Sequence, residues 1–447
     1  MASKVFLVHG WSVQETTTYQ ALHRQLAENG YALEDVFLGR YVSLEDKVEI
    51  RDIALALHMA LDEKLGADWS QPFHIVTHST GALVVRHWIA RHYTGDCCRR
   101  QPLRNLVFLA GPHFGSRLAH HGRSMLAHAR YLGDTGEQVL GALELGSRFS
   151  WELADAWIDS GAWREKGIRP YCLTGDRVKQ GLADRFAAKI FPAGFETGSD
   201  MVVRVPAANL NFRRYTLDAR NGDIQAAGGI EDVPFGALHE YLHSGAEHGI
   251  MNSIKRRSTP ANHKALRLIL ECLGVANDAG YERVHDLLAR QTAETRRKRP
   301  GFAQLDFRFR DSEGQPVDDY VFKFGWWDNG RQKPSETVAH SHKNTVAPSH
   351  FTVFIEMKHL DPEQVYFMEF DSRSGTELYS YEPDPFRVTT GENAVIISEL
   401  VREDHTTQID IVLSRQPSRK LFVFHRGDDP DLHVGWNRNG DIVEIQL

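Results

Sequence analysis

The sequence contains few cysteines and no long apolar run, and both features restrict the kind of protein it can encode. Its 447 residues include only four cysteines, namely Cys97, Cys98, Cys172 and Cys272. They lack the spacing of a metal site, and adjacent cysteines rarely cross-link, so we expect reduced thiols. The first apolar run, Val5–Val8, is too short for a secretory signal or a membrane span. We therefore expect a chain that is cytoplasmic as synthesised, with any export following a route independent of a signal peptide.

An excess of basic residues is also missing. The chain has 52 Lys and Arg against 59 Asp and Glu, which gives a formal net charge of −7. Because acidic residues outnumber basic ones and no basic stripe or clustered run argues for nucleic acid, we expect no nucleic-acid partner. The length exceeds that of one usual hydrophobic core, and 42% of the residues are hydrophobic, so we expect two domains, or one large domain with a smaller satellite.

The first 290 residues show short apolar strands that alternate with amphipathic helices. This alternation predicts an α/β domain over residues 1–290, with a mostly parallel sheet covered on both faces. The strands include Val5–Val8 and the stretch Leu103–Ser116 with its Gly/Pro-rich exit, and we expect Phe212–Leu217 to be the last strand of the sheet. A final helix, Ala265–Leu273, then closes the domain.

Helical spacing replaces the strand rhythm over residues 117–166, where aromatic residues are dense. An insertion at this place predicts a helical lid. Trp151 and Trp157 are candidates for substrate binding in an acyl-chain pocket, and the alternative is that these rings only fill a core.

Residues 291–301 are polar and basic and end in Pro-Gly, which predicts a linker. After it, apolar and polar residues alternate with a period of two at Leu305–Phe309, Phe351–Ile355 and Gln408–Leu413. Short alternating strands separated by turns predict an antiparallel β-sandwich over residues 302–447. Its sequence does not indicate a role.

One stretch, residues 73–85, carries the strongest chemical signal. An apolar strand ends at His78, Ser79 occupies the corner, and an apolar helix follows Gly81. A serine at a sharp strand-to-helix turn needs small neighbours two positions away, and its hydroxyl is then exposed above the sheet. Thr77 replaces the first glycine of the common G-x-S-x-G form, so the motif is degenerate.

Ester hydrolysis by a serine needs an imidazole base and a carboxylate that orients it. The order Ser, Asp, His along the chain is the one expected of α/β-hydrolases. Asp200 is the preferred acid, with Asp176 as its alternate. His248 is the preferred base, because an apolar segment follows it, and His243 is its alternate.

The motifs around these residues resemble those of α/β-hydrolase lipases. They are His9-Gly10, the Ser79 elbow, the loop Ser199-Asp200-Met201-Val202-Val203 and the loop His248-Gly249-Ile250. The resemblance is to bacterial phospholipase-like members, including lipase effectors of type VI secretion and relatives of the GPI-inositol-deacylase group, and it covers the N-terminal two-thirds of the chain.

This resemblance implies roles for individual residues and for partners. Ser79 is implied as nucleophile, with the backbone N–H groups of Trp11 and Thr80 as the oxyanion hole. The implied substrate is a lipid or a membrane surface, from which the enzyme releases a fatty acid, and a secreted effector would meet an immunity or delivery protein. We expect no cofactor and no metal; a calcium requirement is not readable.

Two other functions compete with a serine esterase. His239-Glu240-Tyr241-Leu242-His243 matches H-E-x-x-H, whose histidines one helical turn apart can bind zinc, so a zinc metallohydrolase is one alternative. The other is a binding protein built on an inactive hydrolase fold. The intact order of the triad residues favours the esterase.

Overall fold

The structure, a computed structural model, describes most of the chain. The described residues are 3–10, 20–36, 45–66, 70–95, 102–117, 119, 136–159, 162–177, 197–361, 363–389, 397–418, 421, 433–436 and 442–445. Trp11, Cys97 and Cys98 lie outside these ranges. Cys172 and Cys272 are buried free thiols, as expected.

The predicted parallel sheet is present and has six strands. Its order is β2-β1-β3-β4-β5-β8, and every neighbouring pair is parallel. The strands are β1 (Ser3–Val8), β2 (Tyr31–Val36), β3 (Phe73–His78), β4 (Leu103–Leu109), β5 (Arg169–Asp176) and β8 (Phe235–His239). Because all strands run the same way, the residues that follow them gather at one edge of the sheet.

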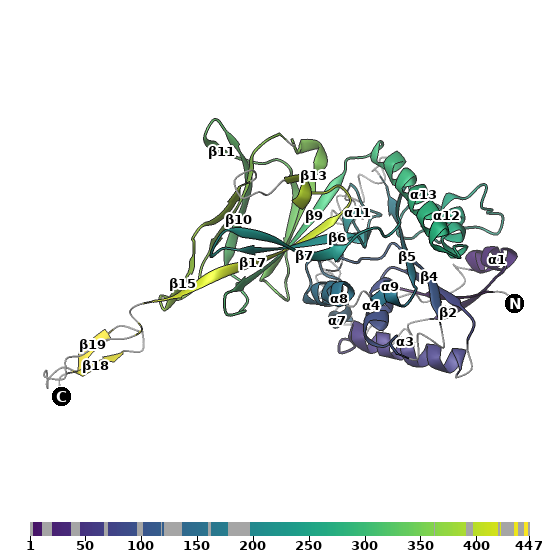
Figure 1. Ribbon diagram of the computed structural model, residues 1–447, viewed down its shortest axis with the longest axis horizontal. Helices are drawn as coiled ribbons and strands as arrows, with labels where there is room; N and C mark the ends of the chain where they lie inside the picture. The colour runs from purple at the N-terminus through teal and green to yellow at the C-terminus, as the bar shows by residue number, and fades with distance from the viewer. Residues whose placement is uncertain are drawn as a thin grey trace, which may run out of the picture.

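Helices cover both faces of this sheet (Figure 1). Alternate residues of β1 point to opposite faces: Val5 and Leu7 belong to one core, and Phe6 and Val8 to the other. The first core contains residues of α1 (Gln20–Glu28), α12 (Lys264–Leu273) and α13 (Asp278–Arg296). The second contains residues of α3 (Ile50–Leu65), α4 (Gly81–Arg91), α7 (Glu137–Leu143), α8 (Arg148–Asp159) and α9 (Ala162–Glu165).

The described part of the 117–166 insertion is helical, as predicted. Helices α7, α8 and α9 lie on the same face as α3 and α4, and their apolar side chains join the core there. The rest of the insertion, which includes residues 120–135, lies outside the described residues.

The strand Phe212–Leu217 was predicted for the hydrolase sheet, and that prediction is wrong. It forms β6 (Phe212–Asp218), which pairs with β7 (Asp223–Ile230) and with β17 (Thr406–Pro417) of the C-terminal sheet. The last strand of the hydrolase sheet is instead β8. The β6–β7 hairpin therefore leaves the hydrolase sheet between β5 and β8 and completes the sheet of the second domain.

About half of the predicted linker at 291–301 is helix in the structure. Helix α13 continues to Arg296, and β9 (Phe302–Asp311) begins at Phe302. A polar and basic composition is shared by linkers and by the exposed face of a helix, so composition could not separate them. Only a few residues connect the two domains at this point.

The C-terminal domain is a β-sandwich of two sheets, as predicted. One sheet has the order β11-β10-β14-β16 and the other β12-β13-β9-β17-β6-β7, with β15 paired to β17. The remaining strands are β10 (Tyr320–Asp328), β11 (Arg331–Pro334), β12 (Val338–Lys343), β13 (His350–Glu356), β14 (Tyr366–Ser372), β15 (Tyr379–Glu382) and β16 (Phe386–Thr389). Short helices are α11 (Val205–Ala208), η3 (Met357–His359) and α14 (Ile397–Leu400).

The sandwich is not purely antiparallel, which corrects the prediction. Strand β17 runs parallel to both β9 and β6. Its alternate residues Ile409, Ile411 and Leu413 share one core with residues of β9 and of β14 in the facing sheet. Period-two alternation reports only that one face of a strand is buried, so it does not predict the direction of the neighbouring strand.

The last two strands form a separate hairpin. β18 (His433–Trp436) pairs with β19 (Ile442–Ile445), and Figure 1 shows this hairpin away from the three larger sheets. Among the helices in the described ranges, none is both long and apolar enough to cross a membrane.

Polar contacts join the two domains. Glu144, which is fully buried, bonds through Oε1 to His342 Nε2 at 2.9 Å and through Oε2 to Thr345 Oγ1 at 2.8 Å. Gln304 Nε2 donates to Phe114 O at 3.0 Å. Because Gln304 also contacts Asp306 at 2.9 Å, the interface includes a buried carboxyl group.

Asp306 makes the stability of this interface depend on pH. It is fully buried, and burial raises its pKa to about 7, although Gln304 and Thr352 donate to it. The unfolded carboxyl titrates near pH 4. The folded state therefore retains a proton that the unfolded state has lost, so the stability contribution is fully present below about pH 4 and is lost as pH rises through about 7.

We expect Asp306→Asn to raise the free energy of unfolding relative to wild type by on the order of 2 kcal/mol at pH 8 and by much less at pH 5. The amide keeps an acceptor for Gln304 and Thr352 and cannot ionise. Urea unfolding of both proteins at the two pH values measures the difference. Equal differences at pH 5 and pH 8 would contradict the expectation.

Candidate active site

Ser79 occupies the corner between β3 and α4, as the sequence predicts. Its φ of 56° lies in the left-handed region, which is rare for a residue with a side chain and is typical of a nucleophile elbow. Gly81 is needed because a Cβ there would lie 2.5 Å from Val8 O. A Cβ at Gly10 would lie 2.7 Å from Ser79 Cβ, so the segment that follows β1 lies directly against the serine.

Ser79 is part of a hydrogen-bonded triad. Its Oγ lies 2.9 Å from His243 Nε2, and His243 Nδ1 lies 2.8 Å from Asp200 Oδ2. A carboxylate only accepts, so Nδ1 carries the proton and Nε2 accepts from the serine hydroxyl. The Asp200 side chain is fully buried and that of His243 is 10% exposed. This arrangement can transfer a proton from the serine to the imidazole.

Backbone groups hold the carboxylate of Asp200 in place. Its Oδ1 accepts hydrogen bonds from the N–H groups of Val202 at 2.9 Å and Val203 at 2.7 Å. The backbone N–H of His243 donates to Asp200 O at 2.9 Å. These bonds leave Oδ2 free for the imidazole and fix the two loops relative to each other.

The preference for His248 as the histidine of the site is wrong. The chain turns at Glu240, whose φ is 70°, and Leu242 N then donates to His248 O at 2.8 Å. This bond pairs the start and end of the 242–250 loop, so His243 points to Ser79 while His248 lies across from Leu242. The apolar segment after His248 packs its Ile250 into the core, so it indicated burial and not the position of the imidazole.

Asp176, the alternate acid, is not in the triad. It ends β5, is fully buried and forms an ion pair with Arg299. Burial raises the pKa of Asp176 to about 7, and Arg299 opposes this rise.

The H-E-x-x-H interpretation fails on geometry. His239 is the last residue of β8, and Glu240 begins a turn, so the two histidines are not on one helical face. His243 is bonded to Ser79 and Asp200. Over the described ranges, no group of three His, Cys, Asp or Glu side chains is placed to hold a metal ion.

His78 is a site residue that sequence reasoning missed. Its Nε2 donates to the backbone O of His243 at 2.9 Å, and the two ring centroids are 4.8 Å apart. Burial, together with the neighbouring imidazole, lowers the pKa of His78 to about 3. His78 therefore stays neutral and ties the residue before the serine to the loop that carries His243. Its position next to Ser79 was the only sequence signal.

Of the two predicted oxyanion donors, one lies in the described residues. Thr80 is the N-cap of α4 and is buried beside the serine. Its N–H therefore lies at the positive end of the α4 dipole. Trp11 lies outside the described residues.

Trp151 and Trp157 were predicted to contact substrate, but both side chains are buried and pack against protein groups. Trp157 is 2% exposed and its Nε1 donates to Arg86 O at 3.1 Å. Trp151 is 1% exposed, and the guanidinium groups of Arg214 and Arg308 lie 5.0 and 4.6 Å from its ring centroid. Both rings are therefore core and interface residues.

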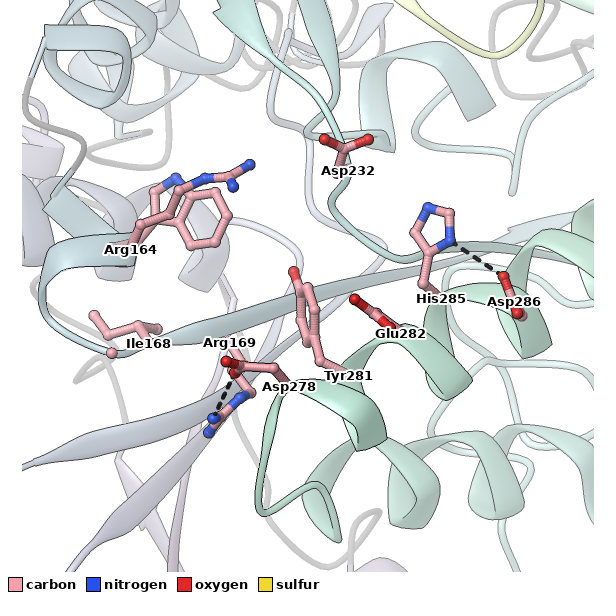
Figure 2. A pocket seen from close by; sticks show the side chains of 11 residues that line it. Arg164, Ile168, Arg169, Asp232, Asp278, Tyr281, Glu282, His285 and Asp286 are labelled. Atoms are coloured by element: carbon pink, nitrogen blue, oxygen red, sulfur yellow. Dashed lines mark hydrogen bonds and ion pairs between the residues drawn. The ribbon is translucent and has the colours of Figure 1, made fainter.

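A cavity of about 690 Å³ lies elsewhere on the hydrolase domain. Figure 2 shows Tyr281 and Glu282 of α13 facing Arg164, with Arg169 bonded to Asp278. Arg169 begins β5, whereas Ser79 follows the end of β3, so this cavity and the triad lie at opposite edges of the parallel sheet. It is not the cavity of the triad.

Comparisons with known proteins agree with the fold described above. No protein-family model and no curated protein matches the sequence. Among solved structures, phospholipase PlaB from Legionella pneumophila has 25% identity and a TM-score of 0.82, over 96% of this chain and 97% of that chain. The same phospholipase in complex with thio-NAD gives 26% identity, a TM-score of 0.82 and the same coverage.

The match spans both the α/β domain and the sandwich, and it agrees with the resemblance that the elbow and its surrounding motifs indicated. The chain is a hydrolase of the lipase and esterase type. Together with the fold, these whole-chain matches support an α/β-hydrolase of the lipase and phospholipase type.

Proposed function

We propose that this protein is a serine-dependent lipase or phospholipase that releases a fatty acid from a lipid ester through an acyl-enzyme on Ser79. The observation that carries the proposal is the hydrogen-bonded triad, with 2.9 Å from Ser79 Oγ to His243 Nε2 and 2.8 Å from His243 Nδ1 to Asp200 Oδ2. The whole-chain similarity to a phospholipase supports a lipid as substrate.

In the first half-reaction, His243 Nε2 takes the proton of Ser79 Oγ as the oxygen attacks the ester carbonyl carbon. The imidazolium is stabilised by Asp200, which is buried and therefore acts through a low dielectric. The tetrahedral intermediate then collapses, and His243 gives its proton to the departing alcohol oxygen. For a phospholipid this alcohol is a lysolipid.

In the second half-reaction, His243 takes a proton from water, and the hydroxide attacks the acyl carbon on Ser79. Collapse of the second intermediate returns the proton to Ser79 Oγ and releases the fatty acid. The negative oxygen of both intermediates needs donors close to the serine. We propose the N–H groups of Thr80, at the N-terminus of α4, and of Trp11, which lies outside the described residues, for this role.

The reaction class is tested by incubating mixed phospholipids with wild type and with Ser79→Ala, and analysing the products by mass spectrometry. We expect lysolipid and fatty acid from wild type and none from Ser79→Ala. The matched control is Ser70→Ala, an exposed serine just before β3, which should retain full activity.

Other outcomes identify the competing functions. Equal release by wild type and Ser79→Ala would reject the acyl-enzyme. No hydrolysis of any lipid, together with no labelling of Ser79 by a fluorophosphonate, would favour a binding protein on a hydrolase fold.

A further inference from the structure

We propose that Arg299 is a positioning residue for this hydrolase, because it holds the bases of the Asp200 and His243 loops against the β-sandwich. The inference rests on the proposed function only for its effect on catalysis. Its effect on the two loops can be measured without any substrate.

Arg299 contacts one carboxylate in each domain. Its Nε forms an ion pair with Asp176, and its Nη2 lies 2.6 Å from Asp404 Oδ1. The side chains of Arg299, Asp176 and Asp404 are all fully buried. One guanidinium thus connects the hydrolase sheet to the loop that precedes β17, and its planar fork can reach two carboxylates at once.

Asp176 lies at the base of both the Asp200 loop and the His243 loop. The next residue, Arg177, donates its N–H to Ser199 O at 3.1 Å and closes the base of the Asp200 loop. Asp176 O accepts from Glu240 N at 2.9 Å, at the start of the turn that leads to His243. A displacement of Asp176 would therefore move the base of both loops.

Asp404, on the sandwich side, contacts the Asp200 loop directly. Asp404 O accepts from Asn209 Nδ2 at 2.8 Å, and Asn209 follows α11 at the far end of the Asp200 loop. The Asp404 carboxylate also accepts from Arg296 Nε at 2.7 Å. Asp404 is therefore held by two arginines, and it contacts the end of the loop while Arg299 holds its beginning.

The positive charge of Arg299 lies among buried carboxylates. Asp176 faces Arg299 and lies close enough to Asp200 and Asp404 for both carboxylates to raise its pKa. A buried cation among three carboxylates reduces their mutual repulsion. Removing Arg299 alone would leave Asp176 without its counter-charge, and an unpaired buried charge destabilises a fold.

The test therefore uses the charge-balanced pair Asp176→Asn with Arg299→Gln in the full chain. Asp404 keeps Arg296 as its partner, so no buried charge is left alone. We expect a folded protein by circular dichroism, with faster amide exchange in peptides covering residues 197–204 and 240–246. We expect kcat on a soluble short-chain ester to fall about 10- to 100-fold, with little change in KM. The concentration of active enzyme in this measurement is obtained by titrating Ser79 with a fluorophosphonate.

The matched control removes another arginine–aspartate pair by Asp311→Asn with Arg415→Gln. These residues interact at 3.2 Å, and the Asp311 side chain is likewise fully buried. Asp311 is at the opposite end of β9 from Phe302, about 30 Å along the strand. Exchange in the two loops and kcat should remain those of wild type in this control.

A folded double variant at Asp176 and Arg299 with wild-type loop exchange and wild-type kcat would overturn the inference. Arg299→Lys supplies a second test, because lysine keeps the charge but cannot bridge both carboxylates. It should show the same loss of kcat. If wild type itself proves inactive, the proposed function fails, whereas the exchange measurement still decides whether Arg299 positions the loops.

Discussion

Replacing His243 by alanine is expected to lower kcat for ester hydrolysis by a factor on the order of 10⁴ to 10⁶, which is the cost of losing a triad base. The reason is that His243 Nε2 is the group bonded to Ser79 Oγ, at 2.9 Å. The same change at His248, which lies on the other side of the loop, should leave kcat within about twofold of wild type.

The pair of variants is a direct comparison, because both histidines belong to one short loop. Initial rates on a soluble ester, together with circular dichroism to confirm folding, give the measurement. An active His243→Ala beside an inactive His248→Ala would show that the loop is arranged differently and that the triad described above is not the catalytic one.

A chain that ends at Gly301 is expected to be unfolded, although it contains all three triad residues. Removing residues 302–447 would remove β17 and leave β6 with only its partner β7. Tyr215 and Leu217, which are buried in the core of the sandwich in the intact protein, would lose that packing. Arg299 and Asp176 would lose Asp404, and breaking a buried ion network costs about 3–5 kcal/mol, against a total stability of about 5–15 kcal/mol.

Circular dichroism and limited proteolysis of the purified truncated chain measure this result. The control is a chain that ends at Ser418, which keeps all of β17 and removes only the segment that carries the β18–β19 hairpin; it should fold. A folded and active 1–301 chain would show that the β6–β7 hairpin and the Asp200 loop need no support from the sandwich.

The elbow and the parallel sheet are examples of what local pattern can predict. Ser79, with Gly81 two residues later, lies between an apolar strand and an apolar helix, and all of these features are contiguous in sequence. The helix α13 and the parallel partner strands of β17 could not be predicted in the same way. Their composition or alternation is shared with a linker or with an antiparallel strand.

The choice of the site histidine shows where pattern reasoning fails. His243 and His248 have similar sequence surroundings, and the Gly-Ile-Met that favoured His248 indicates only a buried segment. The bond from Leu242 N to His248 O decides which imidazole faces Ser79. That bond depends on a left-handed turn at Glu240, which no sequence signal predicted.

The amino-acid sequence by itself predicted the class of fold, Ser79 as the serine of the candidate site, Asp200 as one of two candidates for its carboxylate, and the presence of a second β domain. These follow from the periodicity of apolar residues and from motifs whose members are neighbours in the chain. Only the tertiary structure showed that His243 is the histidine bonded to Ser79. It also showed that β6 and β7 belong to the sandwich and that Arg299 is buried between two carboxylates. The physical reason is that each of these depends on contacts between residues far apart in the chain, which local pattern does not encode.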